Sequence, residues 1–282
     1  MFRDNPVRFI ELFAHAQAHA ADVHPNTLQR VTRGLSSLGA DTREDPRANQ
    51  LFLDILTAPE SPERVLRLMN ESGVLGRFLP DFGRIVAMMQ FDMYHSYTVD
   101  EHTLKAIGIL HRIESGELRE EAPVASLIMR EVASRRALYV AMLLHDIAKG
   151  RDGDHSILGA DVALVVCPRL GLSSEETETV SWLVRHHLLM SKTAFRYDLN
   201  DPQTIKDFAA IVQSPERLKL LLVLTVADIR AVGPNVWNGW KAALMRDLYY
   251  RCDAVLRGAD PSVIARGNAE QAKEEARSRL TD

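Results

Sequence analysis

Cysteine and excess basic charge are both scarce in this sequence, and each shortage excludes a class of protein. Only Cys167 and Cys252 occur among 282 residues, and neither has a partner at CxxC spacing. A disulfide framework and a zinc finger are therefore excluded, and a reducing cytoplasm is the expected compartment. The formal net charge is -4 at pH 7, so the chain lacks the basic surface that nucleic-acid binding usually requires. We expect no nucleic-acid partner.

Long apolar runs and covalent-catalysis motifs are also missing. The first residues, MFRDNPVRFIELF, mix charged with apolar side chains, and the most apolar later stretch, 220–229, is short and contains Asp228. We therefore expect neither a signal peptide nor a membrane span. There is no GxSxG motif, and neither cysteine has a reactive sequence context, so a covalent nucleophile has no support.

The apolar residues that are present, 46% of the chain, recur at spacings of three and four. Long period-two runs of Val, Ile and Thr are absent, so the pattern predicts an all-α protein of roughly ten helices. Ser173 with Glu176, and Thr98 with Glu101, have the spacing of capping boxes at helix starts. Gly150 is the expected stop of a helix that contains HDIAK.

The expected organisation has three parts. Residues 1–70 form a helical lead-in that is interrupted by prolines, residues 71–256 form the main domain, and residues 257–282 form a charged helical tail. The glycines and prolines after Glu71 indicate turns next to a site that needs a fixed backbone.

Histidines and aspartates recur along the main domain in the order H, HD, H, HH, D. The members are His102, His145, Asp146, His155, His186, His187 and Asp228. A lone histidine is usually a packed or capping residue, but this series can bring imidazoles and carboxylates from several helices to one interior point. Asp146 is the candidate bridge because its two oxygens can reach two ions. Lys149, one turn later, could stabilise charge on a bound phosphate, although it could also only offset the negative end of its own helix.

The mixed imidazole and carboxylate ligands suit a divalent metal, with Mn²⁺ or Fe²⁺ favoured and Mg²⁺ also acceptable. We expect two ions, because seven candidate ligands exceed the needs of one tetrahedral site. Two metals about 3.5 to 4 Å apart can activate a water and clamp a phosphoester. The reaction class expected is phosphoester hydrolysis without a covalent intermediate.

HDIAKG, with His102 before it and Asp228 far behind, resembles the signature of HD-superfamily metal phosphohydrolases. The stretches MNESGVLGRFLPDFGRIVAMMQFDMYHSYTVDEHT, LLHDIAKGRDGDHSILGA, VSWLVRHHLLMS and LTVADIRAVGPNVWNGWK resemble the bifunctional uridylyltransferase/uridylyl-removing enzyme family of bacterial nitrogen control. The resemblance implies a compact helical HD bundle. It implies that His102, His145, Asp146 and Asp228 bind a first metal, and that His155, His186 and His187 bind a second.

The resemblance further implies that the chain removes UMP from the uridylylated PII signal protein. The partner reaction, UMP transfer, is not expected, because the sequence contains no Gly-Ser or Gly-Gly dipeptide for a transferase phosphate loop. Two alternatives stay open: a nucleotide phosphohydrolase, or a regulatory module that senses a ligand such as glutamine, or contacts PII, with little turnover. Arg185 and Arg196 could contact the substrate phosphate or nucleotide, or be solvated at helix ends. Tyr94, His95 and Tyr97 could line the pocket or be half-buried packing residues. Trp237 and Trp240 are expected in the core or at an interface.

Overall fold

The structure, a computed structural model, describes residues 2, 4–60, 62–89 and 97–263. Every regular element within these ranges is a helix, which confirms the predicted all-α fold. In chain order they are α1 (Arg8–Ala18), α2 (Pro25–Gly34), the 3₁₀ helix η1 (Leu35–Ser37), α3 (Ala40–Glu44), α4 (Pro46–Leu56), α5 (Pro62–Glu71), α6 (Val74–Phe78), α7 (Pro80–Gly83) and α8 (Val99–Ser115). They continue with α9 (Pro123–Met129), α10 (Arg135–Leu144), α11 (His155–Arg169), α12 (Ser174–His186), α13 (Leu189–Arg196), α14 (Pro202–Val212), α15 (Pro215–Val232) and α16 (Gly239–Leu256).

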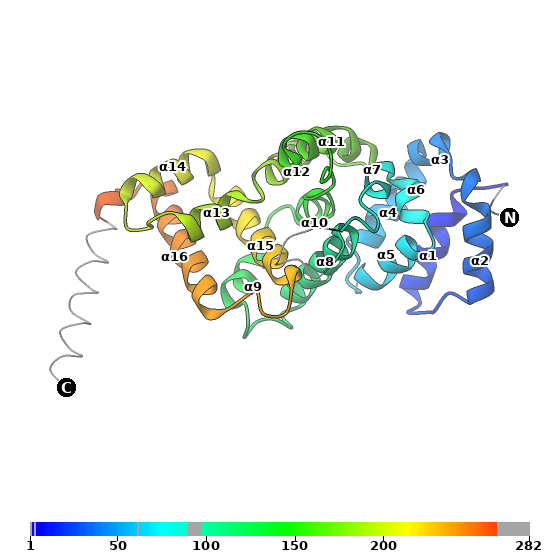
Figure 1. Ribbon diagram of the computed structural model, residues 1–282, viewed down its shortest axis with the longest axis horizontal. Helices are drawn as coiled ribbons and strands as arrows, with labels where there is room; N and C mark the ends of the chain where they lie inside the picture. Colours follow the sequence, from blue (N-terminus) through cyan, green and yellow to red (C-terminus); the bar gives the residue numbers. More distant parts are fainter. Residues whose placement is uncertain (1, 3, 61, 90–96, 264–282) are drawn as a thin grey trace.

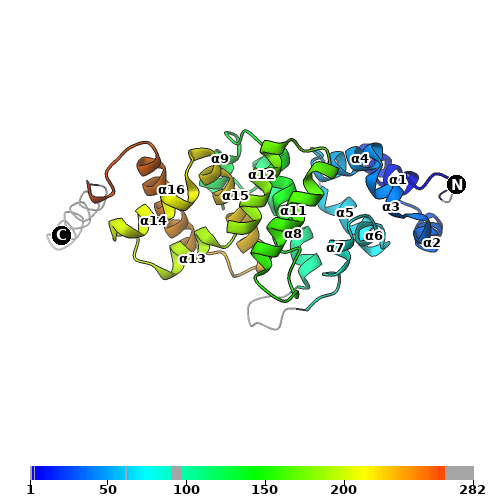
Figure 2. The same ribbon diagram turned by 90° about the horizontal axis from the view of Figure 1, so that it is seen from above.

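The helices are more numerous than expected because prolines and glycines divide the first part of the chain into short pieces. Figures 1 and 2 show an elongated molecule, with α1–α7 at the N-terminal end, α8, α10, α11, α12 and α15 in the middle, and α13, α14 and α16 beyond them. Buried apolar side chains form one cluster that runs from Phe9 to Cys252. The domain boundary predicted after residue 70 falls at the last residue of α5, and it stays a prediction.

Helix starts follow the sequence signals in part. The Ser173 hydroxyl accepts from the Glu176 N–H and the Glu176 carboxylate accepts from the Ser173 N–H, so the capping box predicted for α12 is confirmed. The second predicted box is wrong. Thr98 is the N-cap of α8, but its side chain makes no capping bond, and the Glu101 carboxylate is paired with Arg67 of α5.

Helix α10 lies at the centre of the middle group and determines where the HD pair is placed. Its residues from Ala137 to Leu144 are all buried, and α8, α11, α12 and α15 pack around it. A helix that is apolar on all sides is stable only in such a position. The stop expected at Gly150 is wrong, because α10 ends at Leu144 and HDIAKG follows as turns.

Several residues with predicted roles lie outside the described part of the chain or outside the core. Tyr94 and His95 lie outside the described residues, and so does most of the predicted tail, from residue 264 onward. Trp237 is half-buried, whereas Trp240 is 62% exposed and is not part of the core. None of the described helices is both long and apolar enough to cross a membrane.

Candidate metal centre

The turns after α10 hold Asp146 and Lys149 in register. The Ile147 N–H donates to the Leu144 carbonyl and the Lys149 N–H donates to the Asp146 carbonyl, each at 3.1 Å. Such i to i+3 bonds give three residues per turn, so side chains three apart lie one above the other. The Lys149 Nζ accordingly lies 2.7 Å from Oδ2 of Asp146.

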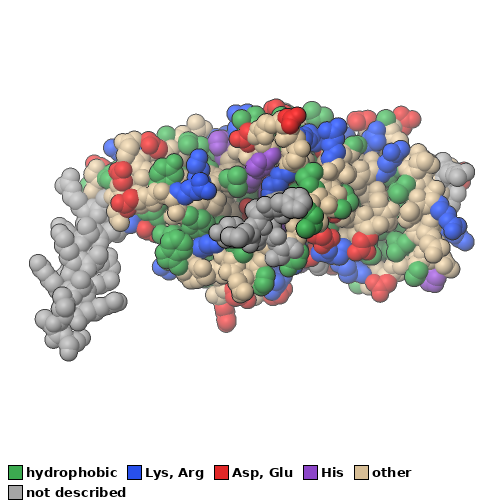
Figure 3. Space-filling view, in the orientation of Figure 1, with side chains coloured by type: hydrophobic (Ala, Val, Ile, Leu, Met, Phe, Trp, Pro, Cys, Tyr) green, Lys and Arg blue, Asp and Glu red, His purple; other side chains and the backbone are tan. Residues whose placement is uncertain are grey.

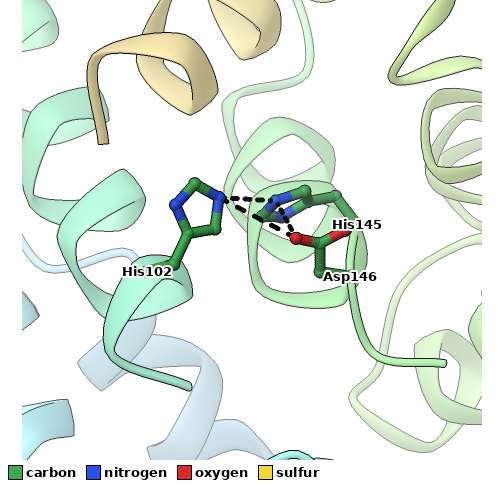
Figure 4. Close-up of side chains that lie close together, drawn as sticks. All are labelled: His102, His145 and Asp146. Atoms are coloured by element: carbon green, nitrogen blue, oxygen red, sulfur yellow. Dashed lines mark hydrogen bonds and ion pairs between the residues drawn. The ribbon is translucent and has the colours of Figure 1, made fainter. Parts of the chain in front are cut away.

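Four of the predicted residues meet in a first group, made by α8, the HD turn and α15. Nε2 of His145 lies 3.3 Å from Nε2 of His102 and 3.3 Å from Oδ2 of Asp146 (Figure 4). Nε2 of His102 also lies 2.9 Å from Oδ1 of Asp228, which lies 3.7 Å from Nε2 of His145. Ligands about 2.1 Å from a tetrahedral ion are separated by roughly 3.4 Å, so these spacings fit one ion.

A second group shares Asp146 and adds His155 and His187. Both histidine Nε2 atoms lie 3.7 Å from Oδ1 of Asp146. Within the described residues, these two nitrogens and this oxygen are buried and have no hydrogen-bond partner. Buried polar atoms of native proteins are nearly always satisfied, and three that face one another without partners fit a bound cation. The group can therefore hold a second ion.

Backbone carbonyls orient two of the histidines. Nδ1 of His145 donates to the Met142 carbonyl at 2.8 Å, and Nδ1 of His187 donates to the Val184 carbonyl at 2.7 Å. In the neutral ring the Nε2 lone pair then faces the centre, which is the arrangement that metal-binding histidines require.

Charge within the cluster shifts the pKa values strongly. Burial lowers the pKa of His145, but Asp146 and Asp228 outweigh it and raise that pKa to about 9. At His187 burial dominates and lowers the pKa to about 4. Burial raises the pKa of Asp146, but His145, Lys149 and His187 bring it well below its ordinary value. The Asp146 carboxylate is therefore ionised, and at His145 a proton competes with a metal ion for the ring nitrogen.

The structure does not bring His186 to either group. Its half-buried ring lies 5.0 Å from the ring of Trp182, measured between centroids. Of the two adjacent histidines, His187 is the one whose Nε2 faces Asp146, at 3.7 Å from Oδ1. Arg185 and Arg196 are exposed on α12 and α13.

Asp100 is a residue of the site region that the sequence analysis missed. Its buried carboxylate accepts from the Asn70 amide at 2.8 Å and from the Ala87 N–H at 3.1 Å. It thereby holds the segment before α8 against the helix that carries His102. Its place two residues before His102 was the only available signal, because its partners are distant in sequence.

Comparison with known proteins agrees with this geometry. Residues 99–231, which include both groups, match the HD domain family. The part of the chain that holds both groups is therefore similar to HD domains. Residues 1–78 match the family described as uridylyltransferase GlnD third domain, so the chain corresponds to a region of the bifunctional enzymes that its sequence resembles.

Three curated relatives are each named bifunctional uridylyltransferase/uridylyl-removing enzyme. The protein of Azospirillum brasilense is 62% identical over 282 residues, all of this chain and 30% of its own length. The protein of Novosphingobium aromaticivorans is 60% identical over 91% of this chain and 28% of its own length. The protein of Rhodospirillum rubrum is 56% identical over 100% of this chain and 30% of its own length. This chain therefore spans about 30% of the length of such relatives.

Proposed function

We propose that this chain is a metal-dependent phosphodiesterase that removes UMP from the uridylylated PII signal protein. The observation that carries the proposal is the pair of ligand groups joined by Asp146. In the second group, three buried ligand atoms have no hydrogen-bond partner among the described residues. The HD domain and the relatives' name, uridylyl-removing enzyme, support the same reaction. The two cysteines, both free and buried, fit a cytoplasmic protein.

In this proposal His102, His145, Asp146 and Asp228 hold one ion, and Asp146, His155 and His187 hold the other. The imidazole-rich donors favour Mn²⁺ or Fe²⁺. When bound, two such ions supply an activated water and neutralise charge on the phosphoester. His186 is left out because it faces Trp182.

The protein's own side chains then position the reaction. The carbonyls of Met142 and Val184 orient the rings of His145 and His187, so Nε2 of each ring faces the centre. Lys149 holds its ammonium beside Asp146, where it can stabilise the charge that develops on a phosphoryl oxygen.

The test is to incubate the metal-loaded chain with uridylylated PII and, separately, with free nucleotides. We expect release of UMP from PII at a kcat/KM well above that for any free nucleotide. Faster hydrolysis of free nucleotides would identify a nucleotide phosphohydrolase instead. Binding of PII without UMP release would identify a regulatory module.

A further inference from the structure

A cavity lies next to the metal centre, along the two helices that carry His102 and Asp228. Its volume is about 540 Å³, which is within the range of small-molecule sites. Lys105 of α8 and Ala231 of α15 line the cavity. Lys105 comes three residues after His102, and Ala231 comes three residues after Asp228. That separation is about 4.5 Å along a helix, so the cavity begins one turn from the metal centre.

The cavity wall contains a cation for which the described part of the chain supplies no carboxylate partner. Among the described residues, Arg112 pairs with Glu117 and Arg230 pairs with Glu121. Within the described residues no ion pair is found for Lys105, and Nζ of this half-buried residue lies 3.8 Å from the centroid of the Tyr97 ring. Lys105 is therefore available to donate to a ligand.

The remaining wall supplies an acceptor and two aromatic faces. Oε1 of Glu63 accepts from Arg67, while its Oε2 lies over Gly108, where any Cβ would overlap it. Because Gly108 has no Cβ, the Glu63 carboxylate can occupy this part of the cavity wall. Tyr97 and Trp237, both half-buried, give the cavity flat apolar surfaces.

We infer that this cavity binds the nucleoside half of the substrate while its phosphate lies at the metal centre. A nucleoside carries carbonyls, hydroxyls and a flat base, and the cavity offers a donor, an acceptor and aromatic faces for them. Lys105 and Trp237 are then the residues that distinguish a nucleotide ester from other phosphodiesters. This inference rests on the proposed function, because it assigns the nucleoside of the ester removed there.

The test compares UMP with inorganic phosphate, both titrated by calorimetry into the Mn²⁺-loaded chain. We expect UMP to bind more tightly than phosphate in the wild-type protein. Lys105→Met and Trp237→Leu should each reduce the ratio of UMP affinity to phosphate affinity by roughly tenfold or more, because each loses a charged donor or a stacking surface. Lys206→Met and Trp240→Leu, at exposed positions outside the cavity, should leave the ratio within about twofold of wild type.

Equal affinity for UMP and phosphate in the wild-type protein, or an unchanged ratio in both cavity variants, would overturn the inference. The UMP affinity of each variant is divided by the phosphate affinity of the same variant. Loss of folding or of metal would weaken the binding of both ligands, so it cannot imitate the expected fall in this ratio. UMP release from uridylylated PII is measured separately. If it is absent while UMP binding behaves as expected, the proposed function fails and the nucleoside site stands.

Discussion

Nε2 of His102 lies 2.9 Å from Oδ1 of Asp228, although 126 positions separate the two residues in the sequence. The contact joins α8 to α15 at the point where the HD turn arrives from α10. In a metal-free protein it is a hydrogen bond, and on metal binding the same two atoms can become neighbouring ligands.

Asp228→Asn tests the first group, because it removes an anionic ligand with little change of volume. We expect Mn²⁺ affinity to fall at least about 100-fold. Even the loss of a residue that only hydrogen-bonds to a metal ligand lowers metal affinity roughly 10- to 100-fold. Competition with a chelating dye measures the affinity. Asp161→Asn, at an exposed position on α11, is the matched control and should bind Mn²⁺ as wild type does. Wild-type affinity in Asp228→Asn would exclude this carboxylate as a ligand.

The two adjacent histidines at the end of α12 make a matched pair for the second group. His187→Ala should lose one metal ion per chain, whereas His186→Ala should keep both, because only His187 faces Asp146. Elemental analysis after Mn²⁺ reconstitution and desalting gives the stoichiometry. Loss of an ion in His186→Ala, with none lost in His187→Ala, would show that His186, and not His187, binds the metal.

Lys149 should affect turnover and leave metal content unchanged. Lys149→Met removes the ammonium beside Asp146, and we expect kcat to fall on the order of 100-fold, as for other single groups that stabilise transition-state charge. Steady-state kinetics and metal analysis are made on the same preparation. If Lys149→Met keeps wild-type kcat, the lysine only balances the charge of Asp146.

Metal uptake should release a proton below about pH 9. The pKa of His145 is raised to about 9, so in the metal-free protein this ring is protonated at pH 7.5 and must lose its proton to bind an ion. Calorimetric heats of Mn²⁺ binding in buffers of different ionisation enthalpy should show about one proton released at pH 7.5, and fewer as the pH passes 9. Heats at pH 7.5 that are independent of the buffer would mean that His145 is already neutral.

The sequence alone predicted the helical fold and which residue types gather at the site. Apolar spacing identified helices, and the order of histidines and aspartates identified the residues that α8, the HD turn, α11 and α15 bring together. It did not show which histidine of the pair at 186 and 187 faces inward, because that depends on the rotation of α12 about its axis. Nor did it find Asp100, whose partners Asn70 and Ala87 become neighbours only when α5 and α8 pack.

Anomalous diffraction from crystals of the Mn²⁺-loaded chain tests the central claim most directly, since it locates the ions themselves. We expect two peaks about 3.5 to 4 Å apart on either side of the Asp146 carboxylate. One should lie among His102, His145 and Asp228, and the other between His155 and His187. A single peak, or a second peak that does not contact Asp146, would contradict the shared centre.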